Sequence, residues 1–232
     1  MLLSTMNYEE MYRELTSDHE NVTRWMERQR RRMMDVARRC KELPKHLIWK
    51  YKSPRKNDWY IDVMLTNRNP DKGHLISECV LRRADDGWWV HHVMVNKYCS
   101  VQCILTPHCL KRYAERTGRE EMRIEELVSE WLICNHDVMG DDDQSLSGKK
   151  SRGGENEQRH YCTTEGVLMG DAIRDPKTGI AKTFVAKTFI TYDMATARQV
   201  VVFGRNKEKL FDTENLKQSV MEYEKRTYKK WI

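Results

Sequence analysis

The sequence predicts an α+β fold in which an antiparallel sheet is combined with a small number of helices. Apolar residues recur at helical spacing between residues 8 and 43, with arginines on the other faces. Residues 59–66 alternate apolar and polar side chains, which is the period of a half-buried strand. Short polar turns separate this run from strand-like runs on either side, so we expect antiparallel pairing.

The long N-terminal helix is expected over 8–43 and ends before Pro44. A break at Ser17 and Asp18, where either residue suits a helix cap, would divide it into two helices. Residues 200–203 fit either a strand or the end of a helix that begins at Asp193. The other expected elements are strands at 47–52, 59–66, 75–82, 88–95, 101–105, 160–169 and 181–192, and helices at 106–118, at 123–134 and from 207.

Three parts are expected along the chain. A basic helical arm occupies 1–45, an α+β core 46–205, and a C-terminal helix 206–232. The core is interrupted at 137–159, where 23 residues rich in Asp, Ser, Gly and Lys contain almost no apolar side chain. This composition predicts a flexible insertion.

The overall composition indicates a polar protein of the cytoplasm. Apolar residues make up 39% of the chain, and the mean hydropathy is −0.80. No apolar run approaches the roughly 18 residues that span a bilayer, so we expect no membrane partner. The first residues do not have the pattern of a signal peptide. Seven scattered cysteines, an odd number, are expected to be mostly free thiols in a reducing compartment.

Positive charge is concentrated in one segment. Residues 24–45 hold nine basic and three acidic side chains, an excess equal to the net charge of +6 of the whole chain. Such a basic helix suggests RNA or another nucleic acid as the partner. A solvated helix face, or a surface for a protein partner or a second copy of the chain, is the alternative. The predicted nucleic-acid-binding residues are Arg24, Arg28, Arg31, Arg32, Arg38 and Arg39.

The segment 105–118 has the most specific pattern. His108, Arg112 and Arg116 stand four residues apart and so share one side of a helix. Thr106 and Pro107 suit the helix start, where backbone N–H groups attract anions. A group that can move a proton near neutral pH, beside two guanidinium groups, suits phosphate chemistry. In the structural alternative, Glu115 pairs with Lys111 or Arg112, Glu120 pairs with Arg116, and His108 only caps the helix.

A strand followed by His-x-x-x-Arg-x-x-Glu-Arg resembles a motif of the barnase, colicin and RelE-like ribonuclease-toxin superfamily. The resemblance covers about residues 100–195 and implies a bacterial or phage protein in which this helix precedes an antiparallel sheet. The chain departs from the family in its greater length, its additional strands before the motif and its insertion. The matching residues are Thr106, His108, Arg112, Glu115 and Arg116, with Gly118 one place later than in the family.

The resemblance implies RNA cleavage without a metal or another cofactor. His108 would take or give a proton, while Arg112 and Arg116 hold the phosphate. A further group would come from the strand at 187–192, where Thr188 and Thr191 lie on opposite faces and both stay open as candidates.

Three functions therefore stand side by side. The first is an RNA-directed, metal-independent ribonuclease-like protein, and the second is a non-catalytic protein that binds nucleic acid or protein through the basic helix. The third is a zinc-stabilised scaffold, although the usual Cys-x-x-Cys spacing is absent. Its candidate ligands are Cys99, Cys103, His108, Cys109, Cys134, His136, His160 and Cys162.

Overall fold

The computed structural model describes residues 1–95, 100–135, 139–140, 156–174, 181–197, 199–201 and 203–204. Its centre is a nine-stranded sheet with the order β1-β2-β3-β4-β5-β9-β8-β7-β6. The strands are β1 (Lys45–Lys52), β2 (Asp58–Leu65), β3 (His74–Ala84), β4 (Gly87–Val95), β5 (Ser100–Leu105), β6 (Met139–Gly140), β7 (Asn156–Cys162), β8 (Val167–Arg174) and β9 (Ala181–Ile190).

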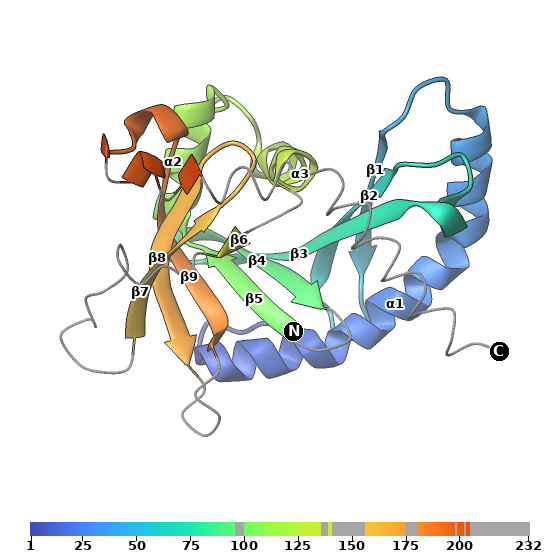
Figure 1. The fold of residues 1–232 in the computed structure, drawn as a ribbon. Coiled ribbons are helices and arrows are strands. Elements are labelled where there is room, and N and C mark those ends of the chain that lie inside the picture. The colour runs from blue at the N-terminus through green and yellow to red at the C-terminus, as the bar shows by residue number, and fades with distance from the viewer. Residues whose placement is uncertain are drawn as a thin grey trace.

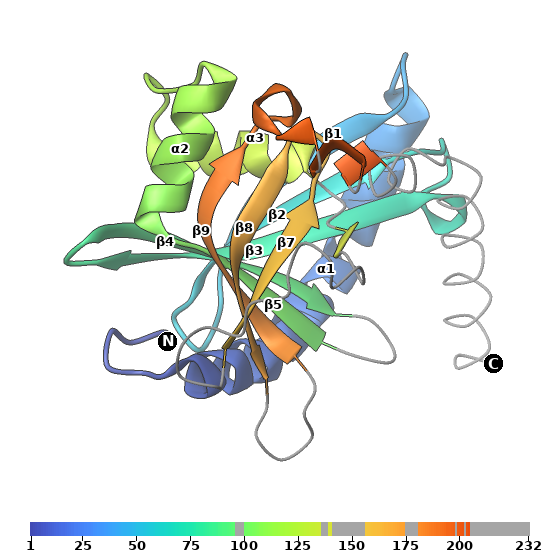
Figure 2. The same ribbon diagram turned by 60° about the vertical axis from the view of Figure 1, so that its left-hand side comes forward.

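Helices cover both faces of the sheet (Figures 1 and 2). Helix α1 (Tyr8–Arg39) runs along one face, while α2 (Pro107–Thr117) and α3 (Ile124–Cys134) lie on the other. Two single 3-10 turns, η1 (Pro70–Lys72) and η2 (Tyr192–Met194), follow β2 and β9. The predicted α+β class is therefore confirmed.

The sheet is antiparallel with one exception. Strands β5 and β9 pair in parallel, from Gln102 opposite Thr183 to Leu105 opposite Ala186. Parallel neighbours need a crossover connection, and here the chain between β5 and β9 includes α2, α3 and the strands β6–β8. This ladder joins the meander β1–β5 to the strands β6–β9.

The two faces of the sheet have separate hydrophobic cores. On the α2 and α3 side, Tyr113, Trp131 and Phe189 meet edge to face, with ring centroids 4.9 to 6.4 Å apart. On the α1 side, buried aliphatic residues of the helix pack on β1–β4. The stripe that α1 buries consists of Met11, Leu15, Val22, Met26, Met33 and Ala37.

The break expected at Ser17 and Asp18 is wrong, because α1 is continuous from Tyr8 to Arg39. Asp18 does not cap a helix. Its fully buried carboxylate faces the sheet and accepts hydrogen bonds from Ser53 (2.6 Å), Asn57 (2.7 Å) and Trp59 (2.9 Å). These donors belong to the β1–β2 turn and to β2, so one carboxylate fastens the middle of α1 to the sheet.

The single strand expected at 160–169 is also wrong, because the segment contains the β7–β8 hairpin. Thr163 and Gly166 close its turn, with the Thr163 N–H donating to the Gly166 carbonyl (2.8 Å). A Cβ at Gly166 would lie 2.3 Å from the Ile190 carbonyl oxygen, so the close approach of β9 requires glycine.

The expectations for the second half of the chain are partly confirmed, partly wrong and partly outside the described residues. The described residues of 197–204 are helical, so the strand alternative for 200–203 is wrong. Part of the predicted insertion 137–159 forms β6 and the start of β7, whereas 141–155 and the predicted C-terminal helix 206–232 lie outside the described residues. The division of the chain at residues 45 and 205 stays a prediction.

Replacing Asp18 by alanine is expected to lower the free energy of unfolding by about 3 kcal/mol or more. The substitution removes the acceptor of three buried donors, of which Asn57 keeps a second hydrogen bond to Glu14 (3.3 Å). Each donor left unpaired costs about 1–3 kcal/mol. Urea denaturation measures the loss. The control is Asp58→Ala, which removes an exposed carboxylate 3.5 Å from Lys52 and should change stability little. Equal effects of the two substitutions would contradict the role of Asp18.

The same contacts predict a loss of stability in acid. Burial alone would raise the pKa of Asp18, but the hydrogen bonds from Ser53, Trp59, Asn21 and Asn57 outweigh it and lower the pKa. A hydrogen bond from Arg55 is the main cause that lowers the pKa of Glu14 to about 2.

Both folded-state pKa values lie below those of the unfolded chain, about 3.9 and 4.3. Their contribution is therefore complete above about pH 5 and disappears as the pH falls toward 2. Urea unfolding between pH 5 and pH 2.5 should show a smaller loss for Asp18→Asn than for the unchanged protein. Parallel pH profiles would contradict this assignment.

Candidate functional site

Helix α2 is held where β5 ends, over the parallel ladder. The Thr106 side chain accepts from the Cys109 N–H (3.2 Å) as the N-cap, and its hydroxyl donates to the Ala186 carbonyl (2.9 Å). Pro107 occupies the first turn, and Gly118 ends the helix in the left-handed region at φ 69°. The predicted start and end of this helix are thus confirmed, and its N-terminus is fixed to β9.

The three residues of the motif follow one another along α2 but differ in their contacts. His108 is exposed and has no hydrogen bond with a described residue. Arg112 donates to Glu115 (2.8 Å), and Arg116 donates to the backbone carbonyl of Phe189 in β9. A phosphate that used both guanidinium groups would have to share or displace these contacts, whereas His108 is accessible.

Thr188 and Thr191 lie on either side of Phe189, whose carbonyl holds Arg116. Thr188 is a partly exposed residue near the end of β9, and Thr191 follows the strand and precedes η2. Arg116, at the C-terminal end of the motif, therefore contacts the backbone between these two threonines.

A polar cluster around Glu165 holds the C-terminal end of α2. The Glu165 carboxylate accepts from the Tyr113 hydroxyl (2.7 Å) and from Asn135 (3.1 Å), and it pairs with Arg119 (2.8 Å). Burial, followed by Glu165, raises the pKa of Tyr113, which therefore stays a neutral donor. Sequence reasoning missed this cluster because its members come from α2, the end of α3 and the β7–β8 turn.

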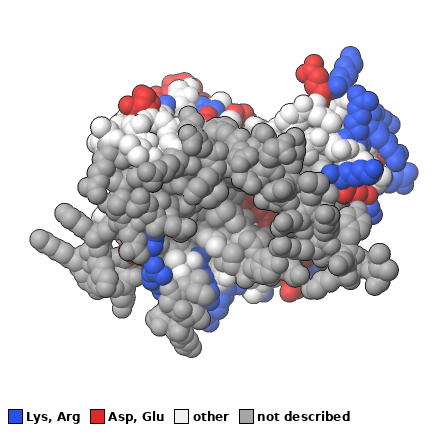
Figure 3. Space-filling view, viewed as in Figure 1, with Lys and Arg blue, Asp and Glu red and all other residues white. Residues whose placement is uncertain are grey.

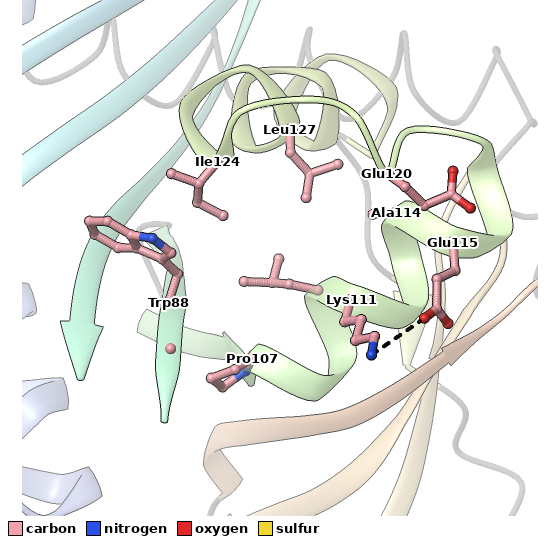
Figure 4. Close-up of a pocket in the computed structure, with 10 residues that line it drawn as sticks. Trp88, Pro107, Lys111, Ala114, Glu115, Glu120, Ile124 and Leu127 are labelled. Atoms are coloured by element: carbon pink, nitrogen blue, oxygen red, sulfur yellow. Dashed lines mark ion pairs between the residues drawn. The ribbon is translucent and has the colours of Figure 1, made fainter. Parts of the chain in front are cut away.

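A pocket of about 420 Å³ opens on the other flank of α2, between α3 and the start of β4 (Figure 4). Trp88 forms one wall, and Glu115 and Glu120 lie at the opposite end in Figure 4. Lys111 lies at 3.8 Å from Glu115 and is 73% exposed. The apolar lining consists of Gly87, Trp88, Pro107, Leu110, Ala114, Ile124 and Leu127.

The two histidines that follow Trp88 and Trp89 belong to the interior. His91 is hydrogen-bonded to Gln102 (2.7 Å), and His92 to Ser77 (3.1 Å). Burial, with a smaller effect of Arg82, lowers the pKa of His91 to about 3, so its ring is neutral. Neither ring is available to stack on a nucleic-acid base, whereas Trp88 lines the pocket.

A second candidate surface lies on the outward side of α1, opposite its buried stripe. All six predicted arginines of this helix are exposed, and we call them the α1 ridge. In Figure 3, Lys and Arg side chains gather where Figure 1 places the C-terminal half of α1. The members of the α1 ridge are Arg24, Arg28, Arg31, Arg32, Arg38 and Arg39.

The described residues contain no group of three or more His, Cys, Asp or Glu side chains placed to hold a metal ion. Burial raises the pKa of Cys103 to about 12 and that of Cys109 well above its usual value. In the metal-free protein both therefore remain protonated thiols near neutral pH. Two other suggested zinc ligands, Cys99 and His136, lie outside the described residues.

No protein-family model, curated protein or solved structure significantly matches this chain. The resemblance to ribonuclease toxins therefore stays a prediction. Among the helices that the structure describes, none is both long and apolar enough to cross a membrane.

Replacing Glu165 by alanine is expected to lower the free energy of unfolding by roughly 2–4 kcal/mol. The substitution removes the acceptor of Tyr113 and Asn135 and leaves Arg119, which is only 16% exposed, without its closest carboxylate. Urea denaturation is the measurement. Glu115→Ala is the control, because its partners Lys111 and Arg112 are themselves well exposed. A loss no larger than that of the control would contradict the role of this cluster.

Proposed function

We propose that this protein binds nucleic acid through the α1 ridge. The observation that carries the proposal is a row of exposed arginines on one rigid helix whose opposite side is buried against the sheet. Arginine matches phosphate oxygens with two parallel hydrogen bonds. Because the helix is already packed on the sheet, binding would have little backbone to order.

The charges of the α1 ridge are largely uncompensated. Arg24 lies 3.7 Å from Glu20, and Arg32 lies over the Trp49 ring at 5.9 Å. The remaining four have no ion pair with a described residue. These four are Arg28, Arg31, Arg38 and Arg39, all exposed. By contrast, Arg13 near the start of the same helix is paired with Glu9 four residues earlier (2.7 Å).

The length of the α1 ridge suits an extended phosphate backbone. From Arg24 to Arg39 the helix rises by about 22 Å, because each residue adds about 1.5 Å. Successive phosphates of one strand are about 3.4 Å apart along a duplex. The α1 ridge can therefore contact several phosphates at once, with an affinity that depends steeply on salt.

Neutralising the four uncompensated arginines together (Arg28→Gln, Arg31→Gln, Arg38→Gln and Arg39→Gln) should weaken nucleic-acid binding at least tenfold at about 0.1 M salt. The log–log salt dependence should also become shallower by roughly three, since each phosphate contact contributes about 0.7–0.9. Fluorescence anisotropy with labelled single-stranded and duplex oligonucleotides measures both quantities.

The matched control removes four positive charges that are already in exposed ion pairs. It combines Arg13→Gln, Lys52→Gln, Arg123→Gln and Arg174→Gln. This variant has the same net charge but should retain most of the affinity. Equal losses in the two variants would mean that total charge, not the α1 ridge, determines binding.

RNA cleavage at α2 is the second candidate function, favoured by the exposure of His108 beside a helix N-terminus. In this reaction the imidazole takes the proton of an RNA 2′-hydroxyl, and the resulting oxygen attacks the adjacent phosphorus. The bond to the 5′-oxygen breaks, and an acid protonates that leaving oxygen. The backbone N–H of His108 in the first turn of α2 and the Arg112 guanidinium offer positive charge to the phosphate oxygens.

His108→Ala should reduce the rate of RNA cleavage at least a hundredfold while leaving the affinity of the α1 ridge unchanged, since a general acid or base contributes about 10²–10⁴. Cleavage of labelled RNA is measured in the presence of EDTA, with 2′-O-methyl RNA as the non-reactive substrate. His74→Gln, a change in β3, is the control. Cleavage that persists in His108→Ala, or that 2′-O-methyl RNA also undergoes, would contradict this mechanism.

A further inference from the structure

A pair of stacked aromatic rings lies beside the α1 ridge, at one edge of the sheet. Trp25 of α1 and Tyr51 of β1 have ring centroids 4.9 Å apart, and their ring planes are inclined by only 19°. We infer that this pair stacks on the bases of a single-stranded nucleic acid whose phosphates contact the α1 ridge. The inference rests on the proposed function and specifies its ligand, because a single strand exposes base faces that a duplex conceals.

The stacked pair lies at an open margin of the sheet. Strand β1 is the first in the strand order, so among the described residues no strand pairs with its outer edge. Figure 1 shows β1 beside the C-terminal half of α1. Trp25 and Tyr51 are both partly exposed, whereas Trp59, the partner of Tyr51 in the β1–β2 ladder, is fully buried. Part of the stacked pair can therefore be reached from solvent.

Trp25 is held in place before a ligand arrives. One side of its ring system is stacked on Tyr51, and it meets Trp49 of β1 edge to face at 81°, with ring centroids 5.6 Å apart. Trp49 is itself buried in the hydrophobic core beneath α1. A ring that is already ordered loses little freedom when a base stacks on it. Such stacking tolerates any sequence, because every base has a π-face.

Guanidinium groups of the α1 ridge flank the aromatic pair. Arg28 follows Trp25 by three residues and so lies on the same side of the helix. The Arg32 guanidinium lies over the Trp49 ring, 5.9 Å from its centroid. A strand with one base against the pair would therefore bring neighbouring phosphates to these arginines. Ordered rings beside a row of cations are the combination with which proteins bind single strands irrespective of sequence.

The unchanged protein tests the inference without any substitution. Fluorescence anisotropy compares a short single-stranded RNA, a DNA strand of the same sequence, and an abasic DNA strand that has the same phosphates but no bases. We expect the RNA or the DNA strand to bind at least about fivefold more tightly than the abasic strand, since one base-stacking contact contributes at least this factor. The tighter of the two complete strands identifies the natural class of polymer.

Substitutions locate the contact. Trp25→Leu should weaken binding of the single strand roughly 5- to 100-fold and leave the affinity for a duplex nearly unchanged. Trp25→Phe keeps an aromatic ring and should retain most of the affinity. Tyr51→Leu makes the same test from β1 if Trp25→Leu does not fold, and circular dichroism shows which variants are folded.

Trp89→Leu is the matched control. Trp89 is likewise partly exposed and has a guanidinium, that of Arg82, 5.2 Å from its ring, but it belongs to β4 and not to the α1 ridge or β1. Its replacement should leave the affinities for single strand and duplex unchanged.

The inference is overturned if the abasic strand binds as tightly as the complete strands, or if folded Trp25→Leu or Tyr51→Leu protein binds single strands as the unchanged protein does. In both cases the fourfold arginine variant could still lose nucleic-acid binding, so the proposed function would stand. If neither single strands nor duplex bind at all, both proposals are overturned.

Discussion

The parallel pairing of β5 with β9 is the contact on which the rest of the molecule depends. It joins the strands β1–β5 to the strands β6–β9, which otherwise pair only among themselves. Thr106 extends this ladder by one residue, because its N–H donates to the Ala186 carbonyl (3.2 Å) and its hydroxyl donates to the same oxygen. Helix α2 begins at this point, so the position of every candidate residue on α2 follows from the ladder.

Helix α2 lies between two candidate surfaces. One side carries His108 and Arg112, and the flank toward α3 lines the Trp88 pocket. Contacts at Thr106, Tyr113 and Arg116 tie the helix to β9 and to the β7–β8 turn. A ligand on either side therefore meets a surface that is already in place, and binding has little backbone to order.

Local patterns predicted the elements well and the long-range contacts poorly. The meander β1–β4 could be predicted because turn residues and alternation are local signals, and α2 because Thr106, Pro107 and Gly118 mark its ends. The parallel pair could not, since Leu105 and Ala186 are distant in sequence. The helix break suggested at Asp18 was wrong, because the sequence cannot distinguish a buried aspartate from one that caps a helix.

For the candidate site, too, local features could be predicted from the sequence and long-range contacts could not. The four-residue spacing correctly placed His108, Arg112 and Arg116 on successive turns of one helix. It could not reveal that Arg116 is held by a backbone carbonyl, because such an acceptor leaves no mark in the sequence. It also gave no sign of the pocket, whose walls come from three separate elements.

The arginine-rich side of α1 also destabilises the helix. Arg24, Arg28 and Arg32 follow one another at four-residue intervals, and like charges at this spacing repel. The apolar stripe beneath them, which includes Val22, Met26 and Met33, must offset that repulsion. Dissolved ions screen the mutual repulsion as they screen the attraction for phosphate. High salt is therefore expected to favour the isolated helix and to weaken the proposed binding of nucleic acid.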